Sequence, residues 1–365
     1  MGKIRVGVIG AGTIAEIGHL PYYQQHPDVE LVSVVDMNLE RARSIANKFG
    51  ASSAYQTAEE MFENEDIDAV SICTSNVSHI PLAQLAITNG VDVLIEKPIG
   101  ISYADAQALA KKVAKNNRIC MVGMTHRFRN EAIAAKRFID NGDVGDVYYV
   151  KAKILRRRGT PTGWFTDKSI AGGGPLMDIG VHVLDLAWWL VGKPNPETVT
   201  GHLVKGIGKY NTEMFSTWNS SQPENRENQI FDVEDFGTAL IRFDNGIVLH
   251  LEVSWAINGA QDEGLKVEVF GTKGGISLEP LVYYTEMNNI FLESKLAIEK
   301  NNPMESEMNH FIESVQTRNQ PLIDANDGAK IIGMLEGIYL SSDFKKEINI
   351  RKDIFKLNTD LQMDL

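Results

Sequence analysis

The chain has 365 residues, of which 43% are hydrophobic and 23% are charged, a composition typical of a globular protein with about two domains. Its formal net charge of −12 repels a phosphate backbone, so we expect no nucleic-acid partner. The chain enters an apolar strand at once, and no apolar run approaches the roughly 20 residues that span a bilayer, so we expect a cytoplasmic protein without a membrane segment.

The first third of the chain alternates short apolar runs with helical runs. The predicted strands are Ile4–Gly10, Glu30–Asp36, Ala69–Thr74, Val91–Glu96 and Arg118–Met124. The predicted helices are Thr13–Gln25, Asn38–Phe49, Ser78–Thr88 and Ser102–Lys115. Continuous apolar strands that alternate with helices predict an α/β domain, residues 1–124, with a doubly wound parallel sheet. Cys73 and Cys120 lie in two of these strands, which indicates buried thiols rather than a disulfide or a metal site.

After Met124 the pattern changes. Predicted helices cover Asn130–Asn141, Pro175–Val191, Glu305–Thr317 and Ala325–Asp343. Predicted strands cover Val147–Arg156, Val199–Leu203, Asp235–Phe243, Ile247–Ala256 and Leu265–Phe270. Asp244-Asn245-Gly246 indicates a hairpin turn, and crossover helices are lacking between these strands. We therefore expect an α+β domain, residues 125–365, with a large and mostly antiparallel open sheet.

Two features of this second domain predict contacts between copies of the chain. The strands Gly237–Phe243 and Ile247–Ala256 carry apolar residues on both faces, and few helices are available to cover the second face. We therefore expect a homodimer or homotetramer. The segment Lys205–Ile230 is polar, irregular and long for a connection, which predicts a mobile flap or a subunit-contacting arm.

A glycine-rich motif lies between the first strand and the first helix. Gly10–Ala15 (GAGTIA) matches G-x-G-x-x-G/A in the strand–turn–helix context that a Rossmann dinucleotide site requires. Gly10 would allow the tight turn, Gly12 would leave room for a pyrophosphate, and Ala15 would let the helix pack on the sheet. The amides of the first helical turn, which includes Thr13 and Ile14, would then meet the phosphates. The alternative is a glycine-rich turn without a ligand.

Asp36 ends the second strand, where a carboxylate can accept hydrogen bonds from both ribose hydroxyls of NAD. The alternative is that Asp36 caps the next helix, for which Asn38 is better placed. A carboxylate here predicts NAD rather than NADP, because it would repel the 2′-phosphate. No Arg follows Asp36 directly to offset this repulsion, although Arg41 and Arg43 lie close in sequence.

Two further motifs carry candidate catalytic groups. Lys97 follows a strand at its carboxyl end, where it could stabilise a developing alkoxide; the alternative is a solvated surface lysine. Asp178 and His182 are spaced i, i+4 on one face of the helix that begins after Gly172-Gly173-Gly174-Pro175. Such a pair suits general acid–base chemistry, but spacing alone equally fits a helix-stabilising pair. A metal site is the third alternative, and because no third ligand accompanies the pair we expect no metal.

The motifs GAGTIA, Asp36, EKP (Glu96–Pro98) and GGGPLMDIGVHVLD, in this order, resemble the glucose–fructose oxidoreductase and inositol dehydrogenase family over nearly the whole chain. The resemblance implies a Rossmann domain followed by an α/β domain whose open sheet often serves oligomerisation. It implies that Lys97, Asp178 and His182 are the catalytic residues. It also implies cofactor contacts by Thr74, Asn76, His79, Glu96 and Lys97.

The resemblance leaves several candidate substrate residues. Arg127 fits the family pattern after the strand Arg118–Met124, whereas His126 departs from it. Arg156, within the run Arg156–Arg158, and Trp164 lie between the first strand of the second sheet and the catalytic helix, where they could shape the pocket. A solvated strand end is the alternative for the arginine run.

These observations predict an NAD-dependent oxidoreductase that transfers a hydride between the nicotinamide and a secondary hydroxyl or ketone of a sugar, inositol or related polyol. The alternative is a glycosidase that uses NAD for transient oxidation, as some members of the family do. A third possibility is a ligand sensor without chemistry, against which the complete set of Lys97, Asp178 and His182 argues.

Overall fold

The structure, a computed structural model, describes residues 2–208 and 230–354, which form two compact units. The first unit contains residues 2–125 and 302–332, and the second contains the other described residues. The predicted division into residues 1–124 and 125–365 differs in one respect, because residues 302–332 return to the first unit. Most of the segment Lys205–Ile230, predicted to be a flap or arm, lies outside the described residues.

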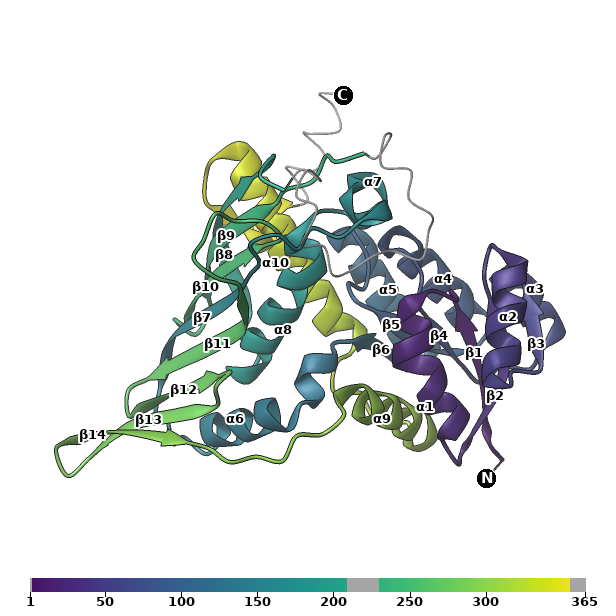
Figure 1. Ribbon diagram of the computed structural model, residues 1–365, viewed down its shortest axis with the longest axis horizontal. Coiled ribbons are helices and arrows are strands. Elements are labelled where there is room, and N and C mark those ends of the chain that lie inside the picture. Colours follow the sequence, from purple (N-terminus) through teal and green to yellow (C-terminus); the bar gives the residue numbers. More distant parts are fainter. Residues whose placement is uncertain (1, 209–229, 355–365) are drawn as a thin grey trace. The chain divides into compact units, whose positions relative to one another are not determined.

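The first unit contains a parallel sheet, as predicted. In the described part of the chain this sheet has six strands in the order β3-β2-β1-β4-β5-β6 (Figure 1). The strands are β1 (Ile4–Ile9), β2 (Val29–Val35), β3 (Ser53–Tyr55), β4 (Ala69–Ile72), β5 (Asp92–Glu96) and β6 (Cys120–Gly123). The strand order reverses next to β1, so the carboxyl ends of β1 and β4 flank the point where such sheets bind ligands.

Helices connect these strands, and side-chain caps fix where several of them begin. They are η1 (Ala15–His19), α1 (Leu20–Gln25), α2 (Leu39–Phe49), α3 (Ala58–Asn64), α4 (Asn76–Thr88) and α5 (Tyr103–Asn116). Asn38 caps α2 as predicted, accepting a hydrogen bond from the Arg41 amide. The sequence analysis missed β3 and α3, although Thr57 and Glu60 form a capping box that marks the start of α3.

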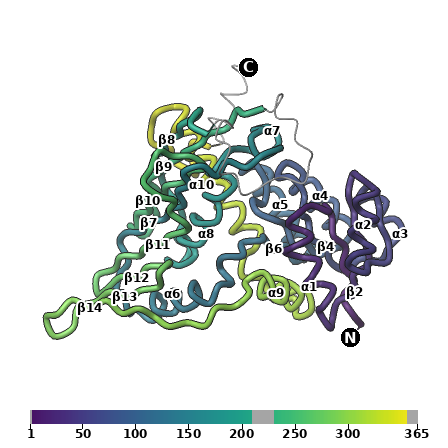
Figure 2. The backbone as a smooth tube through the Cα atoms, in the orientation of Figure 1, coloured from purple at the N-terminus to yellow at the C-terminus, as the bar shows by residue number. Residues whose placement is uncertain are grey.

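Residues from the end of the chain complete the first unit. Helix α9 (Pro303–Thr317) packs against η1 and α1, and Figure 2 traces the chain through it. Beyond α9, the carbonyl of Ile323 accepts a hydrogen bond from the Val122 amide of β6 at 3.1 Å. The chain then enters α10 (Ala325–Phe344), which continues into the second unit.

The second unit contains a mixed sheet, which is mostly antiparallel as predicted. Among the described residues it has nine strands in the order β14-β13-β12-β11-β7-β10-β9-β8-β15, and only β7 and β10 pair in parallel. The strands are β7 (Val147–Leu155), β8 (Pro196–Val204), β9 (Phe236–Phe243), β10 (Val248–Ser254), β11 (Glu263–Gly271), β12 (Gly274–Leu278), β13 (Val282–Met287), β14 (Ile290–Lys295) and β15 (Ile348–Asn349). The predicted hairpin turn is confirmed, since Gly246 has a φ of 85° and its amide donates to the Phe243 carbonyl.

One face of the nine-stranded sheet is covered by helices. Helices α6 (Asn130–Asp140), α8 (Val181–Leu190) and the second half of α10 pack on it (Figure 1). The buried residues of β9 and β10 alternate with outward-facing ones, as a half-covered sheet requires. The outward positions mix apolar and polar side chains: Thr238, Leu240, Arg242, Val248, His250 and Glu252. The expectation of apolar residues on both faces was therefore wrong for four of these six positions.

Within residues 2–208 and 230–354, none of the helices combines the length and apolar character that crossing a membrane requires.

Candidate functional site

The turn after β1 has the geometry that a dinucleotide requires. Gly10 has a φ of 98°, and a Cβ there would lie 2.5 Å from the carbonyl oxygen of Cys73, so only glycine fits. Ala15 is fully buried at the start of η1, as expected for the position that packs the helix on the sheet. Gly12, Thr13 and Ile14 are half-buried between these anchors. The predicted phosphate-binding residues therefore form an accessible turn that leads into a helix, which fits NAD.

Asp36 follows β2 beside this turn, with only 8% of its surface exposed. Its carboxylate accepts hydrogen bonds from the amides of Ala11 at 3.0 Å and Asn38 at 2.8 Å. Arg41 donates to both oxygens, with Nη2 at 2.7 Å from Oδ1 and Nε at 3.1 Å from Oδ2. The predicted ribose-binding carboxylate thus sits next to the glycine turn and already holds a cation.

The loop after β4 carries the predicted cofactor residues Thr74, Asn76 and His79. Thr74 is half-buried, Asn76 is buried at the start of α4, and His79 is 1% exposed. Nδ1 of His79 lies 2.7 Å from the Pro98 carbonyl, and Nε2 lies 3.1 Å from the Thr74 carbonyl. Burial lowers the pKa of His79, although its carbonyl partners oppose that shift. His79 therefore ties the loop after β4 to the loop that contains Lys97.

Glu96 is the last residue of β5 and is also buried. Its Oε1 lies 2.8 Å from Nε2 of His19, and its Oε2 accepts a hydrogen bond from the Lys97 amide at 3.1 Å. Burial opposes ionisation, but the hydrogen bond and charge of His19, together with Lys97, hold the pKa of Glu96 below its usual value. Both predicted cofactor contacts, His79 and Glu96, thus have partners within the unit that fix the backbone around Lys97.

Lys97 is more exposed than its neighbours in the chain. Every residue from Val91 to Gly100 is buried except Lys97, which is half-buried. A strand and loop that bury all their other side chains present this one cation at the carboxyl end of the sheet, where a ligand binds.

The second unit shows the same pattern around the other two predicted catalytic residues. Every residue from Gly173 to Val191 is buried except Asp178 and His182. Asp178 lies in a π-helical turn, η4 (Leu176–Gly180), which runs directly into α8 with His182 in its first turn. Single π-helical turns are frequent at functional sites. Lys97 belongs to the first unit and the Asp178–His182 pair to the second.

Glu234, which the sequence analysis missed, holds the start of this helix. Its Oε1 accepts hydrogen bonds from the amides of Gly174 at 3.0 Å and Leu176 at 3.1 Å, and from the Tyr339 hydroxyl at 2.9 Å. Burial raises the pKa of Glu234, and these donors only partly offset that shift. Its carboxylate satisfies two amides at the helix start, as a capping side chain does.

Close packing around Glu234 and Tyr339 explains the run of glycines. A Cβ on Gly173 would lie 1.8 Å from the Tyr339 hydroxyl, and a Cβ on Gly174 would lie 2.1 Å from the Glu234 carbonyl oxygen. Gly172 adopts a φ of 82°, a conformation that other residues rarely adopt. The three glycines thus bring the helix start against groups that arrive from distant parts of the chain.

Aromatic side chains hold the two candidate catalytic groups. Nε1 of the fully buried Trp255 donates to Oδ2 of Asp178 at 3.0 Å. The ring of His126 meets the ring of His182 edge-on, with centroids 5.0 Å apart. His126, whose role the sequence left open, is therefore a neighbour of the candidate general base.

Arg127, a predicted substrate residue, is fully buried. It donates to both carboxylate oxygens of Asp185 at 2.6 and 2.8 Å, and its guanidinium lies within 6 Å of the ring centres of Trp188 and Trp189. This geometry anchors α8 and argues against direct contact between Arg127 and a substrate.

The other predicted substrate residues lie beyond β7. Trp164 is half-buried and stacks on Phe165, with ring centroids 4.1 Å apart. Arg156 is half-buried, and its amide donates to the Ser254 carbonyl at 3.1 Å. Arg158 donates to the Ile257 carbonyl and the Asn258 side chain. Arg158 therefore stabilises the loop that contains Ile257 and Asn258. The substrate roles of Arg156 and Trp164 stay predictions.

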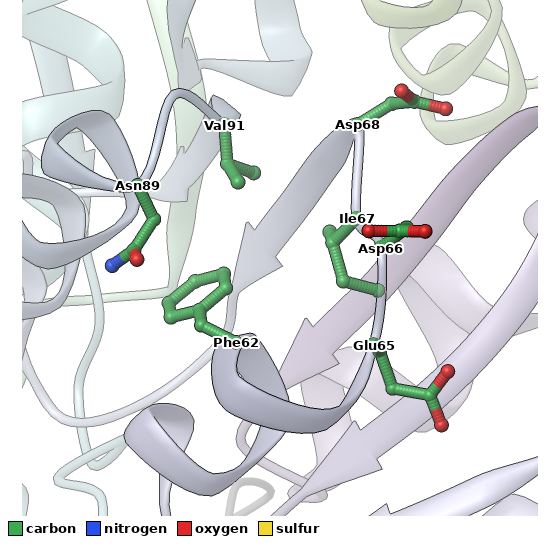
Figure 3. A pocket seen from close by; sticks show the side chains of 7 residues that line it. All are labelled: Phe62, Glu65, Asp66, Ile67, Asp68, Asn89 and Val91. Atoms are coloured by element: carbon green, nitrogen blue, oxygen red, sulfur yellow. The ribbon is translucent and has the colours of Figure 1, made fainter.

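Neither a metal cluster nor the pocket shown in Figure 3 is seen near the cofactor turn in the described part of the chain. Among the described residues, no three His, Cys, Asp or Glu side chains are grouped so that they could hold a metal ion. Figure 3 shows a pocket in the first unit, lined by Phe62, Glu65, Asp66, Ile67, Asp68, Asn89 and Val91. Asp68 and Val91 directly precede β4 and β5, so this pocket lies at the amino ends of the strands, away from the cofactor turn.

Comparisons with known proteins agree with this geometry. Residues 4–124 match the model of an oxidoreductase family with an NAD-binding Rossmann fold, and residues 132–277 match the GFO/IDH/MocA C-terminal domain. The chain is 33% identical to D-glucoside 3-dehydrogenase of Escherichia coli, over 93% of this chain and 95% of that protein. It is 26% identical to scyllo-inositol 2-dehydrogenase (NAD(+)) of Bacillus subtilis, over 98% of both proteins.

A solved structure of levoglucosan dehydrogenase in complex with NADH has the same fold, with a TM-score of 0.82 and 22% identity over 95% of this chain and 99% of that one. The glycine turn, the buried carboxylate of Asp36 beside it and the family match of residues 4–124 point to the same cofactor, NAD. The chain is an NAD-binding member of the GFO/IDH/MocA oxidoreductase family.

Proposed function

We propose that this protein is a dehydrogenase that transfers a hydride between NAD and a secondary hydroxyl of a sugar, inositol or related polyol. The observation that carries the proposal is selective exposure. In the buried stretches Val91–Gly100 and Gly173–Val191, the side chains that stay accessible are Lys97, Asp178 and His182. The named activities of the relatives, on a glucoside and on an inositol, support the same substrate class.

In the oxidation direction, NAD supplies the acceptor for the hydride that leaves the carbon atom. His182 takes the proton of the substrate hydroxyl, because a neutral imidazole can accept a proton near pH 7. Lys97 hydrogen-bonds the same oxygen and stabilises its growing negative charge. Asp178, held by Trp255, accepts a hydrogen bond from a neighbouring hydroxyl and orients the sugar.

A substrate screen tests this function. The wild-type protein and NAD are incubated with methyl glucosides, aryl glucosides, free aldoses and inositols, and NADH absorbance, keto-sugar formation and release of the aryl group are followed together. We expect NADH and a ketone in equal amounts from at least one of these substrates. Cleavage of an aryl glycoside without net NADH would show the redox-assisted glycosidase instead. Binding of sugars without either reaction would indicate a sensor.

We also propose that the chain forms a homodimer or homotetramer through the face of the nine-stranded sheet that the described helices leave open. Helices cover one face, and the other presents apolar Leu240, Val248, Tyr149 and Phe270 among charged residues. Light scattering at micromolar protein concentration should show more than one copy, and a monomer would refute this proposal. The cytoplasmic location stays a prediction.

A further inference from the structure

Arg41 forms an ion pair with the carboxylate that would bind the cofactor ribose. The guanidinium approaches Asp36 as a fork, with contacts of 2.7 Å to Oδ1 and 3.1 Å to Oδ2. The side chain of Asp36 is 7% exposed, whereas that of Arg41 is 32% exposed. The cation of this pair therefore has access to solvent and to a ligand, whereas the anion is buried.

The backbone holds Asp36 independently of Arg41. The amides of Ala11 and Asn38 donate one hydrogen bond to each carboxylate oxygen, so Asp36 keeps its position when the guanidinium leaves. The backbone of Arg41 is also fixed, because its amide donates to the capping side chain of Asn38 at 3.1 Å. Only the long side chain of Arg41 is free to exchange one partner for another.

We propose that Arg41 is a specificity-determining residue, which lets NADP bind at a site whose Asp36 would otherwise reject it. This inference rests on the proposed cofactor site. With NAD, the ribose hydroxyls donate to Asp36. With NADP, the guanidinium turns from the carboxylate to the 2′-phosphate, which it can bind with two parallel hydrogen bonds, and it offsets the repulsion between the two anions.

The chain offers a matched control on the same helix. Arg43 carries the same charge two residues later, but it pairs with Glu40 at 2.9 Å, and both side chains are mostly exposed. A general effect of positive charge on a phosphate would appear when either arginine is removed. If the ion pair with Asp36 is what matters, NADPH binding changes only when Arg41 is removed.

The experiment measures binding rather than activity. The dissociation constants of NADH and NADPH are determined by nicotinamide fluorescence, at one salt concentration, for the wild type and for Arg41→Gln, Arg41→Lys and Arg43→Gln. The loss of one charge-assisted contact predicts that Arg41→Gln raises the ratio Kd(NADPH)/Kd(NADH) by about tenfold or more. Arg41→Lys, which keeps the charge but not the fork, should give an intermediate ratio. Arg43→Gln should leave the ratio at the wild-type value.

An unchanged or lowered ratio in Arg41→Gln would overturn the inference, as would an equal rise in Arg43→Gln. Because Arg41 is partly exposed on a capped helix, Arg41→Lys also guards against misfolding of the glutamine variant. If the folded wild-type protein binds neither nucleotide, the proposed cofactor site fails, and this outcome is distinct from an unchanged ratio.

Discussion

Asp36 in the first unit and Glu234 in the second are both buried carboxylates that accept hydrogen bonds from two backbone amides. They differ in the third donor. Asp36 faces the guanidinium of Arg41, whereas Glu234 faces the neutral hydroxyl of Tyr339. A buried carboxylate is stabilised more by a cation than by a neutral donor, so the two sites should respond differently to substitution.

The difference matches what each site does in the proposed reaction. The Asp36 corner has an accessible cation that can exchange its partner when a nucleotide binds. Glu234 and the glycines around it fix the start of the helix that carries Asp178 and His182. One site is therefore built for ligand exchange and the other for rigidity, and this contrast can be tested by experiments that affect one site at a time.

The largest expected effect separates chemistry from cofactor binding. His182→Ala should lower kcat by about 10²–10⁴-fold, the typical loss when a general base is removed. Lys97→Ala should act similarly, and the double variant should be less than additive because both groups act on one proton transfer. The NAD affinity of His182→Ala should match that of the wild type, because the phosphates bind at the turn Gly10–Ala15.

Steady-state kinetics on a verified substrate and NAD titration together check this separation. If His182→Ala keeps more than about half of the wild-type kcat, His182 is not the base. A parallel loss of NAD affinity would contradict the assignment of separate roles to the two sites.

A smaller effect is expected from adding a methyl group at the helix start. Gly174→Ala should destabilise the protein by about 1–3 kcal/mol, because the new Cβ would overlap the Glu234 carbonyl oxygen and force the backbone apart. Gly264→Ala is the control, since a Cβ on Gly264 meets nothing within 4 Å. Urea unfolding compares the two variants, and equal stabilities would contradict the packing explanation of the glycines.

The smallest expected effect is a change with pH in the stability that Glu234 contributes. Burial raises the pKa of Glu234, so the folded state keeps this proton at pH values where the unfolded chain has lost it. The stability that this proton binding contributes is fully present below the usual pKa of a glutamic acid, and it is lost as the pH rises through the raised pKa of the folded state. Glu234→Gln does not titrate, so its stability relative to the wild type should rise across that window. A stability difference that does not change with pH would rule out the raised pKa.

The two sites also differ in how far the sequence predicts them. The cofactor corner uses residues within one strand–turn–helix–strand segment, Gly10 to Asp36, so a local motif reveals it. The contacts around Gly174 and Asp178 could not be predicted from a local motif. Their partners Glu234, Trp255 and Tyr339 are distant in sequence and approach them only through tertiary packing. The sequence predicted that a helix begins after the three glycines, but it did not show why Gly173 and Gly174 must be glycine.

The same reasoning applies to the fold. Long periodic elements such as α5 and β7 were predicted to within about two residues, which is the usual uncertainty of helix and strand ends. The strands β12–β14 were missed, since they are short, and the last of them is largely exposed and lacks an apolar alternation. Arg127 was assigned to the substrate because its sequence position fits the family pattern, and only the structure shows its buried pairing with Asp185.

The most direct test of the central claim follows the hydrogen atom itself. A sugar that the screen identifies is prepared with deuterium at the carbon that becomes the ketone, and NAD is added in excess. Direct hydride transfer predicts one deuterium in the NADH for every ketone formed, with none released to water. Deuterium in the solvent, or glycoside cleavage that leaves no labelled NADH, would contradict the account.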